Sequence, residues 1–317
     1  MYKRQLEDVY EYMTLGKVFD KPSVVITFDD GYLDNFVYAY PILKKHKVKA
    51  TIFPITSRIN KEDFVRPTLE DYWSGKVSFK ELHKPKPMGK INFEFLTKGS
   101  SKEFLTVAEL NKMKDVFDIE GHADIHAKVF YEDTVLDFFD GKNGHWSAPF
   151  SYSSSNDFTS LEKNYFGFPI FPDKNNLSVR RGFLKKEVKA FIRSFDKSFF
   201  KQKSWKERLK KEIEKEFTAL LDFETEEERE RRVKNELKKS KEELKDLVGK
   251  EINFLSYPFG HYDNQLANWT KEFYKAAFTT EKDIVRQGKN LFTIPRIAIP
   301  KDITSFLIRI AQGAFKK

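Results

Sequence analysis

The sequence predicts an α/β protein built on a parallel sheet that is either open or closed into a barrel. The prediction rests on short apolar runs, typical of buried strands, that alternate with helix-like segments near both ends of the chain. Such alternation is typical of units in which a helix carries the chain from one parallel strand to the next. A chain of 317 residues can form one large domain of this kind or two smaller ones.

The first such unit is predicted close to the N-terminus. Residues 23–28 are a short apolar run that ends at two aspartates and a glycine, as expected of a buried strand that continues into a loop. Apolar residues at helical spacing over 35–46 predict a helix, and 49–54 predict the next strand. Together these segments predict a β-α-β unit.

The same order of elements returns in the middle of the chain and near its C-terminus. A helix is predicted at 105–113, followed by a strand at 116–120. A strand at 252–257 then leads to a helix at about 264–274. Further strands are predicted at 276–280 and 291–294. These elements extend the parallel sheet.

The segment between the two halves is interpreted as an insertion. Residues 127 to about 200 are rich in Phe, Ser, Asn, Gly and Asp, and 151–156 resemble a surface loop. Two helices are predicted after it, at 204–221 and 225–248. We therefore predict a single domain over 1–317 with an insertion at about 127–224.

The second of these helices has clear signals at both ends. Thr225 and Glu228 form a capping box, and Gly249 follows the last turn. The helix carries one apolar stripe, made by Val233, Leu237, Leu244 and Val248. We expect this stripe to pack on the outside of the sheet. A coiled-coil partner is the alternative, although the pattern is shorter than three or four heptads.

Composition excludes several kinds of site. The chain contains no cysteine, so it forms no disulfide and no thiolate metal site, and it has no cysteine nucleophile. Its net charge of +9 comes from 57 basic and 48 acidic residues without a long block of one sign. The alternative is a nucleic-acid-binding protein built around the charged helices, but only the pI of about 9.2 supports it. We therefore expect no nucleic-acid partner.

The sequence gives no indication of a membrane segment. It contains no run of 18 uninterrupted apolar residues, which predicts that the chain has no membrane span. The N-terminal residues also lack the apolar stretch of a secretory signal. As written, the sequence is compatible with the cytoplasm, and with export if a signal peptide has been removed. The compartment stays open.

Two adjacent carboxylates follow the first predicted strand. Asp29 and Asp30 lie where α/β folds place their active sites, at the carboxyl end of a parallel strand. Neighbouring side chains diverge, so one can bind a metal while the other acts as a general base, and Gly31 lets the backbone turn beside them. The alternative is an ordinary acidic turn.

Two histidines follow another predicted strand. His122 and His126 lie four residues apart, a spacing that lets both imidazoles converge on one ion. The chain has only six histidines, so their position directly after a strand favours this interpretation over two incidental surface residues.

Three motifs resemble the carbohydrate esterase family 4 polysaccharide deacetylases, which share the NodB-homology fold. The first is Thr-Phe-Asp-Asp-Gly at 27–31, the second runs from His122 to His126, and the third is Leu-Ser-Tyr-Pro-Phe-Gly at 255–260. The stretches at 30–36, 40–45, 49–53 and 243–250 resemble the poly-N-acetylglucosamine deacetylase branch. The resemblance implies a distorted (β/α) barrel of the NodB-homology type with a large insertion and added long helices.

The resemblance also implies the role of each motif residue. Asp29 matches the catalytic base, and the metal ligands would be Asp30, His122 and His126. The third motif lines the substrate groove, and the implied substrate-binding residues are Tyr257, Pro258 and Phe259. In this motif the backbone N–H of the aromatic residue, here Phe259, helps to hold the oxyanion.

The implied activity is metal-dependent removal of acetyl groups from N-acetylhexosamine units of a polysaccharide or oligosaccharide. A site with two histidines, one carboxylate and open positions suits Zn²⁺, and Co²⁺, Ni²⁺, Mn²⁺ or Fe²⁺ also fit it. Two alternatives stay open. The same site could hydrolyse O-acetyl esters, or the chain could be a carbohydrate-binding relative whose catalysis has lapsed.

The sequence departs from the family pattern at several positions. Ser256 replaces the arginine of the third motif that orients the catalytic aspartate, and Arg296 is our candidate replacement because it follows the last predicted strand. An exposed, ion-paired arginine is the alternative. Ala123 replaces the usual Ser or Thr after the first histidine ligand.

The general acid is a further departure, because the family's late histidine is missing. No histidine follows His261. The proton could come from His261, from His145 in the insertion, or from water at the metal.

Overall fold

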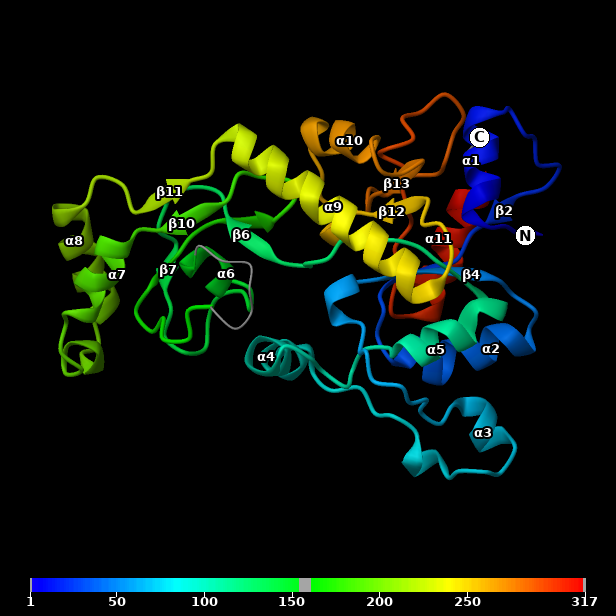
Figure 1. Ribbon diagram of the computed structural model, residues 1–317, viewed down its shortest axis with the longest axis horizontal. Helices are drawn as coiled ribbons and strands as arrows, with labels where there is room; N and C mark the ends of the chain where they lie inside the picture. Colours follow the sequence, from blue (N-terminus) through cyan, green and yellow to red (C-terminus); the bar gives the residue numbers. More distant parts are fainter. Residues whose placement is uncertain (1, 154–160, 316–317) are drawn as a thin grey trace. The chain divides into compact units, whose positions relative to one another are not determined.

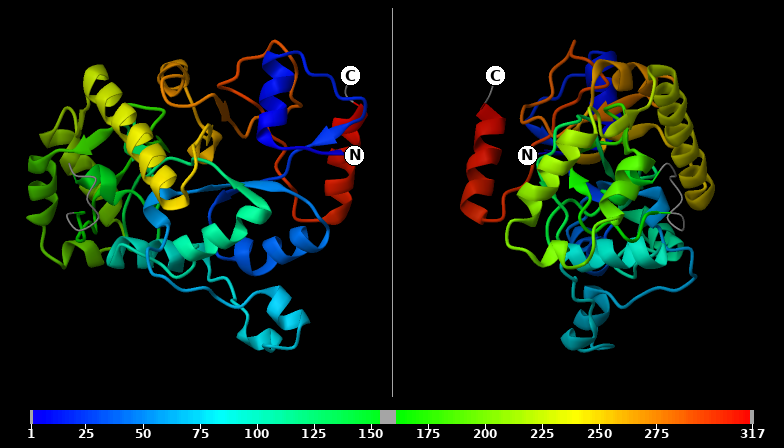
Figure 2. Two further views of the ribbon diagram at one scale, coloured as in Figure 1. Left: turned by 45° about the vertical axis from the view of Figure 1, so that its right-hand side comes forward. Right: turned by 90° about the vertical axis from the view of Figure 1, so that its left-hand side faces the viewer.

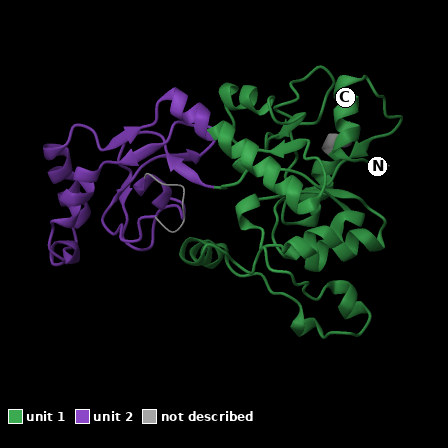
Figure 3. Ribbon diagram, in the orientation of Figure 1, with its two compact units in different colours: residues 1–126, 233–317 green, residues 127–232 purple. Residues whose placement is uncertain are grey.

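The computed structural model describes residues 2–153 and 161–315, which divide into two compact units (Figure 3). Unit 1 contains 1–126 and 233–317, and unit 2 contains 127–232. Unit 2 begins at the residue where the sequence predicts the insertion to begin. The prediction that the whole chain is one domain with an insertion stays a prediction.

Unit 1 contains the elements that follow, labelled as in Figure 1. Its strands are β1 (Tyr2–Lys3), β2 (Ser23–Val24), β3 (Thr27–Asp30), β4 (Ala50–Pro54), β5 (Phe117–Ile119), β12 (Phe254–Ser256) and β13 (Ala276–Phe278). Its α-helices are α1 (Leu6–Thr14), α2 (Tyr40–Lys45), α3 (Leu69–Trp73), α4 (Met88–Lys98), α5 (Val107–Lys112), α10 (Asn264–Thr270) and α11 (Ile303–Phe315). Shorter turns of helix are the π-helix η1 (Asn35–Ala39) and the 3-10 helices η2 (Thr56–Arg58), η3 (Phe79–Glu81), η4 (Met113–Asp115) and η7 (Pro258–Gly260).

The strands of unit 1 are parallel, as the sequence predicts. β3, β4 and β5 form one parallel sheet in that order, and β12 pairs in parallel with β13. A parallel bridge between Gly121 and Leu255 joins the two groups, and another joins Phe278 to Ile294. The order β3, β4, β5, β12, β13 and Ile294 is therefore continuous.

Helices lie against this sheet (Figure 1), and aromatic side chains from β4, β12 and β13 pack together. α2 and α5 lie side by side on the same side of β4 in both views (Figures 1 and 2). The rings of Phe53 and Phe254 lie 6.0 and 6.2 Å from the ring of Phe278, centroid to centroid. All three side chains are buried, so each strand contributes to one apolar core.

The predicted strand at 291–294 is wrong, apart from the bridge at its last residue. The Asn290 side chain accepts the N–H of Phe292 at 2.9 Å, and the Asn290 carbonyl accepts the N–H of Thr293 at 3.3 Å. These bonds turn the chain before it reaches Ile294. Phe292 and Ile294 are buried, and Leu291 is partly buried, in a turn and not in an extended strand.

Unit 2 is built on an antiparallel sheet. Its four strands have the order β11 (Leu221–Phe223), β10 (Gly182–Leu184), β6 (Lys128–Phe130) and β9 (Asp173–Asn175). The remaining elements are β7 (Asp137–Phe138), α6 (Pro149–Tyr152), β8 (Pro169–Ile170), α7 (Lys186–Arg193), η6 (Phe199–Lys201) and α8 (Trp205–Glu216). An aromatic core holds the unit together, with Phe130, Tyr152, Phe168 and Phe171 among its buried rings.

Two predictions for unit 2 are wrong. Ser151 and Tyr152 are buried in α6, where the Ser151 hydroxyl accepts the N–H of Phe130 and the Tyr152 hydroxyl donates to the carbonyl of Pro169. They are therefore not part of a surface loop, and 154–156 of that predicted loop lie outside the described residues. The helix predicted to reach residue 221 ends at Glu216, because Leu221 pairs with Leu184 in the sheet.

The long helix α9 (Glu226–Val248) is confirmed, and the boundary between the units falls within it. The Thr225 N–H donates to the Glu228 carboxylate at 2.8 Å, and the Glu228 N–H donates to the Thr225 hydroxyl at 3.1 Å. The four residues of the apolar stripe predicted for this helix are all buried. Within residues 2–153 and 161–315, no helix is both long and apolar enough to span a bilayer.

Candidate metal centre and active site

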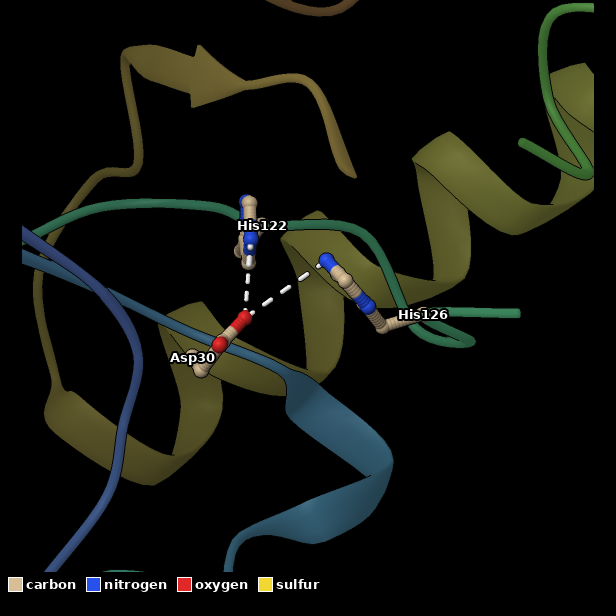
Figure 4. Close-up of side chains that lie close together, drawn as sticks. All are labelled: Asp30, His122 and His126. Carbon is tan, nitrogen blue, oxygen red and sulfur yellow. Dashed lines mark ion pairs between the residues drawn. The ribbon is translucent and has the colours of Figure 1, made fainter. Parts of the chain in front are cut away.

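Three predicted metal ligands lie together in unit 1 (Figure 4). Asp30 Oδ1 lies 3.2 Å from His122 Nε2 and 3.5 Å from His126 Nε2. One ligand atom from each residue lies within 4.8 Å of the other two. The spacing of three side chains from distant parts of the sequence is therefore compatible with one shared ion.

The parallel sheet brings these residues to one edge. Asp30 is the last residue of β3, and His122 follows β5, so both lie at the carboxyl ends of parallel strands. Gly31 makes the turn after Asp30 with φ +77°, and a Cβ at this position would lie 2.8 Å from Pro54 Cβ. Only glycine fits this approach without a shift of the neighbouring chain.

A hydrogen bond orients the imidazole of His122. Its Nδ1 lies 2.7 Å from the carbonyl oxygen of Ser256, so Nδ1–H donates and Nε2 is the nitrogen that faces Asp30 and would bind a cation in place of a proton. Lone pairs of a carboxylate and an imidazole repel each other at 3.2 Å unless a proton or a cation lies between them. The donor set therefore fits a divalent cation.

The pKa shifts of His126 and Asp30 agree with a cation site. Burial lowers the pKa of His126 to about 3, which keeps this imidazole neutral and able to donate a lone pair. Burial would raise the pKa of Asp30, but His122 and His126 outweigh it and lower that pKa to about 2. Burial would lower the pKa of His122, yet Asp30 and Asp29 raise it. The cluster therefore holds an ionised carboxylate that attracts positive charge.

Asp29, the other carboxylate of the first motif, is held by Arg296. Arg296 Nη1 donates to Asp29 Oδ1 at 2.8 Å, and Nη2 donates to Oδ2 at 2.7 Å. Arg296 Nη2 also donates to the Ser256 hydroxyl at 2.7 Å, and that hydroxyl donates to Asp29 Oδ2 at 3.3 Å. Burial would raise the pKa of Asp29, but His122 and Arg296 lower it below its ordinary value. The carboxylate is therefore both oriented and ionised.

The alternative interpretation of Arg296 as an exposed ion-paired residue is wrong. Its side chain is 15% exposed. Its Nε donates to the carbonyl of Thr279 at 3.0 Å, and Nη1 donates to the hydroxyl of Thr27 at 3.2 Å. These bonds hold the guanidinium plane between β3 and the segment that follows β13.

Two of the three residues that the sequence assigns to substrate binding in the third motif are buried in this structure. Tyr257 is fully buried, and its ring stacks on that of Tyr262 at 5.7 Å, centroid to centroid, so its predicted contact with substrate stays a prediction. Pro258 is buried as well. The Phe259 ring is partly exposed and lies 4.1 Å from the ring of His126, centroid to centroid. In this motif the ring of Phe259 therefore borders the predicted ligand His126, and the backbone carbonyl of Ser256 contacts the predicted ligand His122.

Backbone strain is concentrated at the three motifs. In the described part of the chain, four residues other than glycine have positive φ, and three of them are Asp30, Ala123 and Phe259. Such conformations cost about 1–3 kcal/mol each and persist where the surrounding structure enforces them. Each motif therefore contains one residue whose positive φ sets the direction of a side chain or of a backbone amide.

Sequence reasoning missed Arg58 near the metal ligands. Arg58 is 5% exposed, and its guanidinium lies 4.7 Å from the ring of Phe95 and 5.0 Å from that of Phe104. Its charge lowers the pKa of both Asp30 and His126. The one signal in the sequence is its position shortly after the strand β4, which is not specific.

Parts of the sequence match known proteins. Residues 16–126 match the family described as polysaccharide deacetylase. The Bacillus subtilis protein YxkH is 62% identical over 47 residues, which cover 15% of this chain and 17% of the relative. The poly-β-1,6-N-acetyl-D-glucosamine N-deacetylase of Staphylococcus aureus is 34% identical over 120 residues, which cover 35% of this chain and 38% of the relative. These matches span less than two thirds of either relative.

The fold of the whole chain resembles solved structures. A de-N-acetylase from Aggregatibacter actinomycetemcomitans has a TM-score of 0.55 at 13% identity, covering 98% of this chain and 83% of that one. The BpsB deacetylase domain from Bordetella bronchiseptica has a TM-score of 0.51 at 13% identity, covering 93% of this chain and 78% of that one. Residues 16–126 therefore match the polysaccharide deacetylase family, and the chain shares the fold of these deacetylase structures.

Proposed function

We propose that this protein is a metal-dependent hydrolase that removes acetyl groups from N-acetylhexosamine units of a polysaccharide. The observation that carries the proposal is the pairing of Asp29 with Arg296 beside the cluster of Asp30, His122 and His126. An oriented, ionised carboxylate next to a cation site is the arrangement that metal-assisted hydrolysis requires.

Asp30, His122 and His126 would hold the metal ion. Zn²⁺ is the ion we propose first, and Co²⁺, Ni²⁺, Mn²⁺ and Fe²⁺ suit the same donors. When bound, such an ion acidifies water and polarises a carbonyl oxygen. The neutral imidazole of His126 and the ionised carboxylate of Asp30 supply the protonation states that the ligands need.

Asp29 would act as the general base. Its carboxylate would accept a proton from the water that attacks the acetamide carbonyl. The two hydrogen bonds from Arg296 and the one from the Ser256 hydroxyl fix the direction of the carboxylate oxygens. Arg296 would therefore be a positioning residue. Thus Arg296 and Ser256 together would perform the task of the family's motif arginine.

Phe259 and His261 would complete the reaction. The backbone N–H of Phe259 would donate to the developing oxyanion, and a donor of this kind contributes about 3 kcal/mol in other enzymes. The leaving amine needs a proton. His261 is exposed and its ring lies 6.0 Å from the ring of Phe259, so within unit 1 we propose it as the proton donor.

We propose a polymer of N-acetylglucosamine as the substrate. The Staphylococcus aureus relative is named for its action on poly-β-1,6-N-acetyl-D-glucosamine, and its match covers 35% of this chain. We further propose that unit 2 is an insertion in the deacetylase domain, because it interrupts unit 1 between His126 and Val233. The presence of all four motif residues with Arg296 argues against a relative whose catalysis has lapsed.

The test is release of acetate by the protein loaded with Zn²⁺ or Co²⁺. N-acetylglucosamine oligomers and matched O-acetylated glycans are incubated separately with the protein, and acetate is measured over time. Release from the N-acetyl oligomers, lost on Asp29→Asn substitution, supports the proposal. Release from the O-acetyl glycans alone would replace it with an esterase, and no release from either would overturn it.

A further inference from the structure

The helix α9 contacts the back of the loop that carries the two histidines. Lys239 and Ser240 follow Glu236 by three and four residues, so both lie on the same side of the helix as Glu236. The loop 122–126 follows β5, and α9 passes beside it (Figure 4). The contacts are direct and polar.

Glu236 and Ser240 make the buried part of this contact. Glu236 Oε1 accepts the N–H of Ile125 at 3.0 Å, and the Ser240 hydroxyl lies 2.8 Å from the hydroxyl of Thr56. Glu236 is 7% exposed and Ser240 is fully buried. A carboxylate that accepts a buried N–H makes a stronger bond than a neutral acceptor does.

The bond from Glu236 fixes the backbone next to a metal ligand. Ile125 directly precedes His126, so its N–H sets the direction in which the chain enters that residue. The other side of the loop is strained, because Ala123 has φ +62°. The N–H of Thr56 donates to the carbonyl of Ala123 at 3.2 Å, so the Ser240 contact supports this side indirectly.

The third contact is weaker in kind. Lys239 Nζ lies 2.5 Å from Asp124 Oδ2, but the Lys239 side chain is 62% exposed. An ion pair with an exposed partner contributes little to rigidity. Glu236 is therefore the residue of α9 with the most direct hold on the loop.

We propose that Glu236 is a positioning residue for the metal centre, and that through the N–H of Ile125 it holds His126 in the direction needed for metal binding. The inference rests on the proposed function for its metal, but not on the acetylated substrate. It implies that α9, far along the chain, determines the metal affinity of the site.

The test compares Glu236→Ala with Glu236→Gln in the metal-free protein. Each variant is titrated with Co²⁺, and the dissociation constant and the visible absorption of the bound ion are recorded. Loss of a group that orients a metal ligand typically weakens metal affinity about 10–100-fold, and we expect this for Glu236→Ala. The amide oxygen of Gln accepts the same N–H, so Glu236→Gln should recover most of the affinity and the parent spectrum. A merely structural role would leave the spectrum unchanged.

Glu242→Ala is the matched control, because Glu242 lies on the same helix with its side chain 62% exposed. Circular dichroism of the metal-free variants checks folding. Should Glu236→Ala fail to fold, Glu236→Asp decides, because its shorter side chain keeps the carboxylate but withdraws it from the N–H of Ile125, and it should weaken Co²⁺ affinity.

Parent affinity and spectrum in Glu236→Ala, or in Glu236→Asp where that variant decides, would overturn this inference alone. A parent chain that binds Co²⁺ but releases no acetate would overturn the proposed function alone. A parent chain that binds no metal would overturn both.

Discussion

The guanidinium of Arg296 donates two hydrogen bonds, of 2.8 and 2.7 Å, to the carboxylate of Asp29, although the two residues are 267 positions apart in the sequence. The contact joins β3 to the segment beyond β13, the two ends of the continuous strand order. The family's motif arginine would come from position 256, where this chain has a buried serine. In this chain the positive charge that orients Asp29 therefore comes from Arg296, in the segment beyond β13, and not from the third motif.

Replacement of Arg296 by Lys should lower kcat strongly and leave the bound metal unchanged. A lysine carries one ammonium group and cannot reproduce two parallel hydrogen bonds to a carboxylate. A small misplacement of a catalytic group can reduce the rate by about 100-fold. Acetate release gives kcat, and elemental analysis gives the metal content. Arg286→Lys is the control, because that side chain is 39% exposed and pairs with Asp283. Full activity in Arg296→Lys would contradict the assigned role.

Replacement of Asp29 by Asn should abolish most acetate release. The amide has no basic oxygen, and general base catalysis contributes about 10²–10⁴-fold in other enzymes. The metal ligands are untouched, so metal content measured by elemental analysis should stay near the parent value. An Asp29→Asn variant with appreciable activity would show that another group takes the proton.

Replacement of His126 by Ala should lower both metal content and activity, since one of the three ligands is lost. Removal of the metal from the parent protein with a chelator should have the same effect on activity, and Zn²⁺ or Co²⁺ should restore it. His46→Ala is the matched control, because His46 is exposed and is not part of the cluster. Unchanged metal stoichiometry in His126→Ala would remove that residue from the ligand set.

Much of unit 1 could be predicted from local patterns. The apolar run predicted as a strand at 23–28 is divided between β2 and the first half of β3, and the predicted strands at 49–54 and 116–120 contain β4 and β5. Asp29 and Asp30 end β3 and His122 follows β5, so strand ends and candidate ligands come from the same observation. Capping residues also fixed the start of α9. These features depend on neighbours within a few positions.

The errors arise where burial depends on distant residues. Ser151 and Tyr152 look polar enough for a surface loop, but the N–H of Phe130 and the carbonyl of Pro169 satisfy their hydroxyls inside unit 2. The contact of Glu236 with Ile125 spans 111 positions and has no local signature. Such pairs can be found only when the fold brings them together.

Replacement of Ser256 by Ala separates two functions of that residue. Its hydroxyl contacts Arg296 and Asp29, whereas its backbone carbonyl accepts the Nδ1–H of His122. Alanine removes the hydroxyl and keeps the carbonyl. A hydrogen bond to a charged group contributes about 1.5 kcal/mol, so kcat/KM should fall about tenfold if the bond acts in the transition state. Metal affinity, measured by Co²⁺ titration, should stay at the parent value.

A loss of metal affinity in Ser256→Ala, without a loss of kcat, would assign the hydroxyl a different role. If Ser256→Ala weakened metal binding while kcat at saturating metal stayed high, the hydroxyl would support the geometry of His122 and not that of Asp29. Because Ser256 is fully buried, stability is measured in the same samples by thermal unfolding. A loss of kcat/KM with unchanged metal affinity and unchanged stability assigns the hydroxyl to the orientation of the catalytic carboxylate.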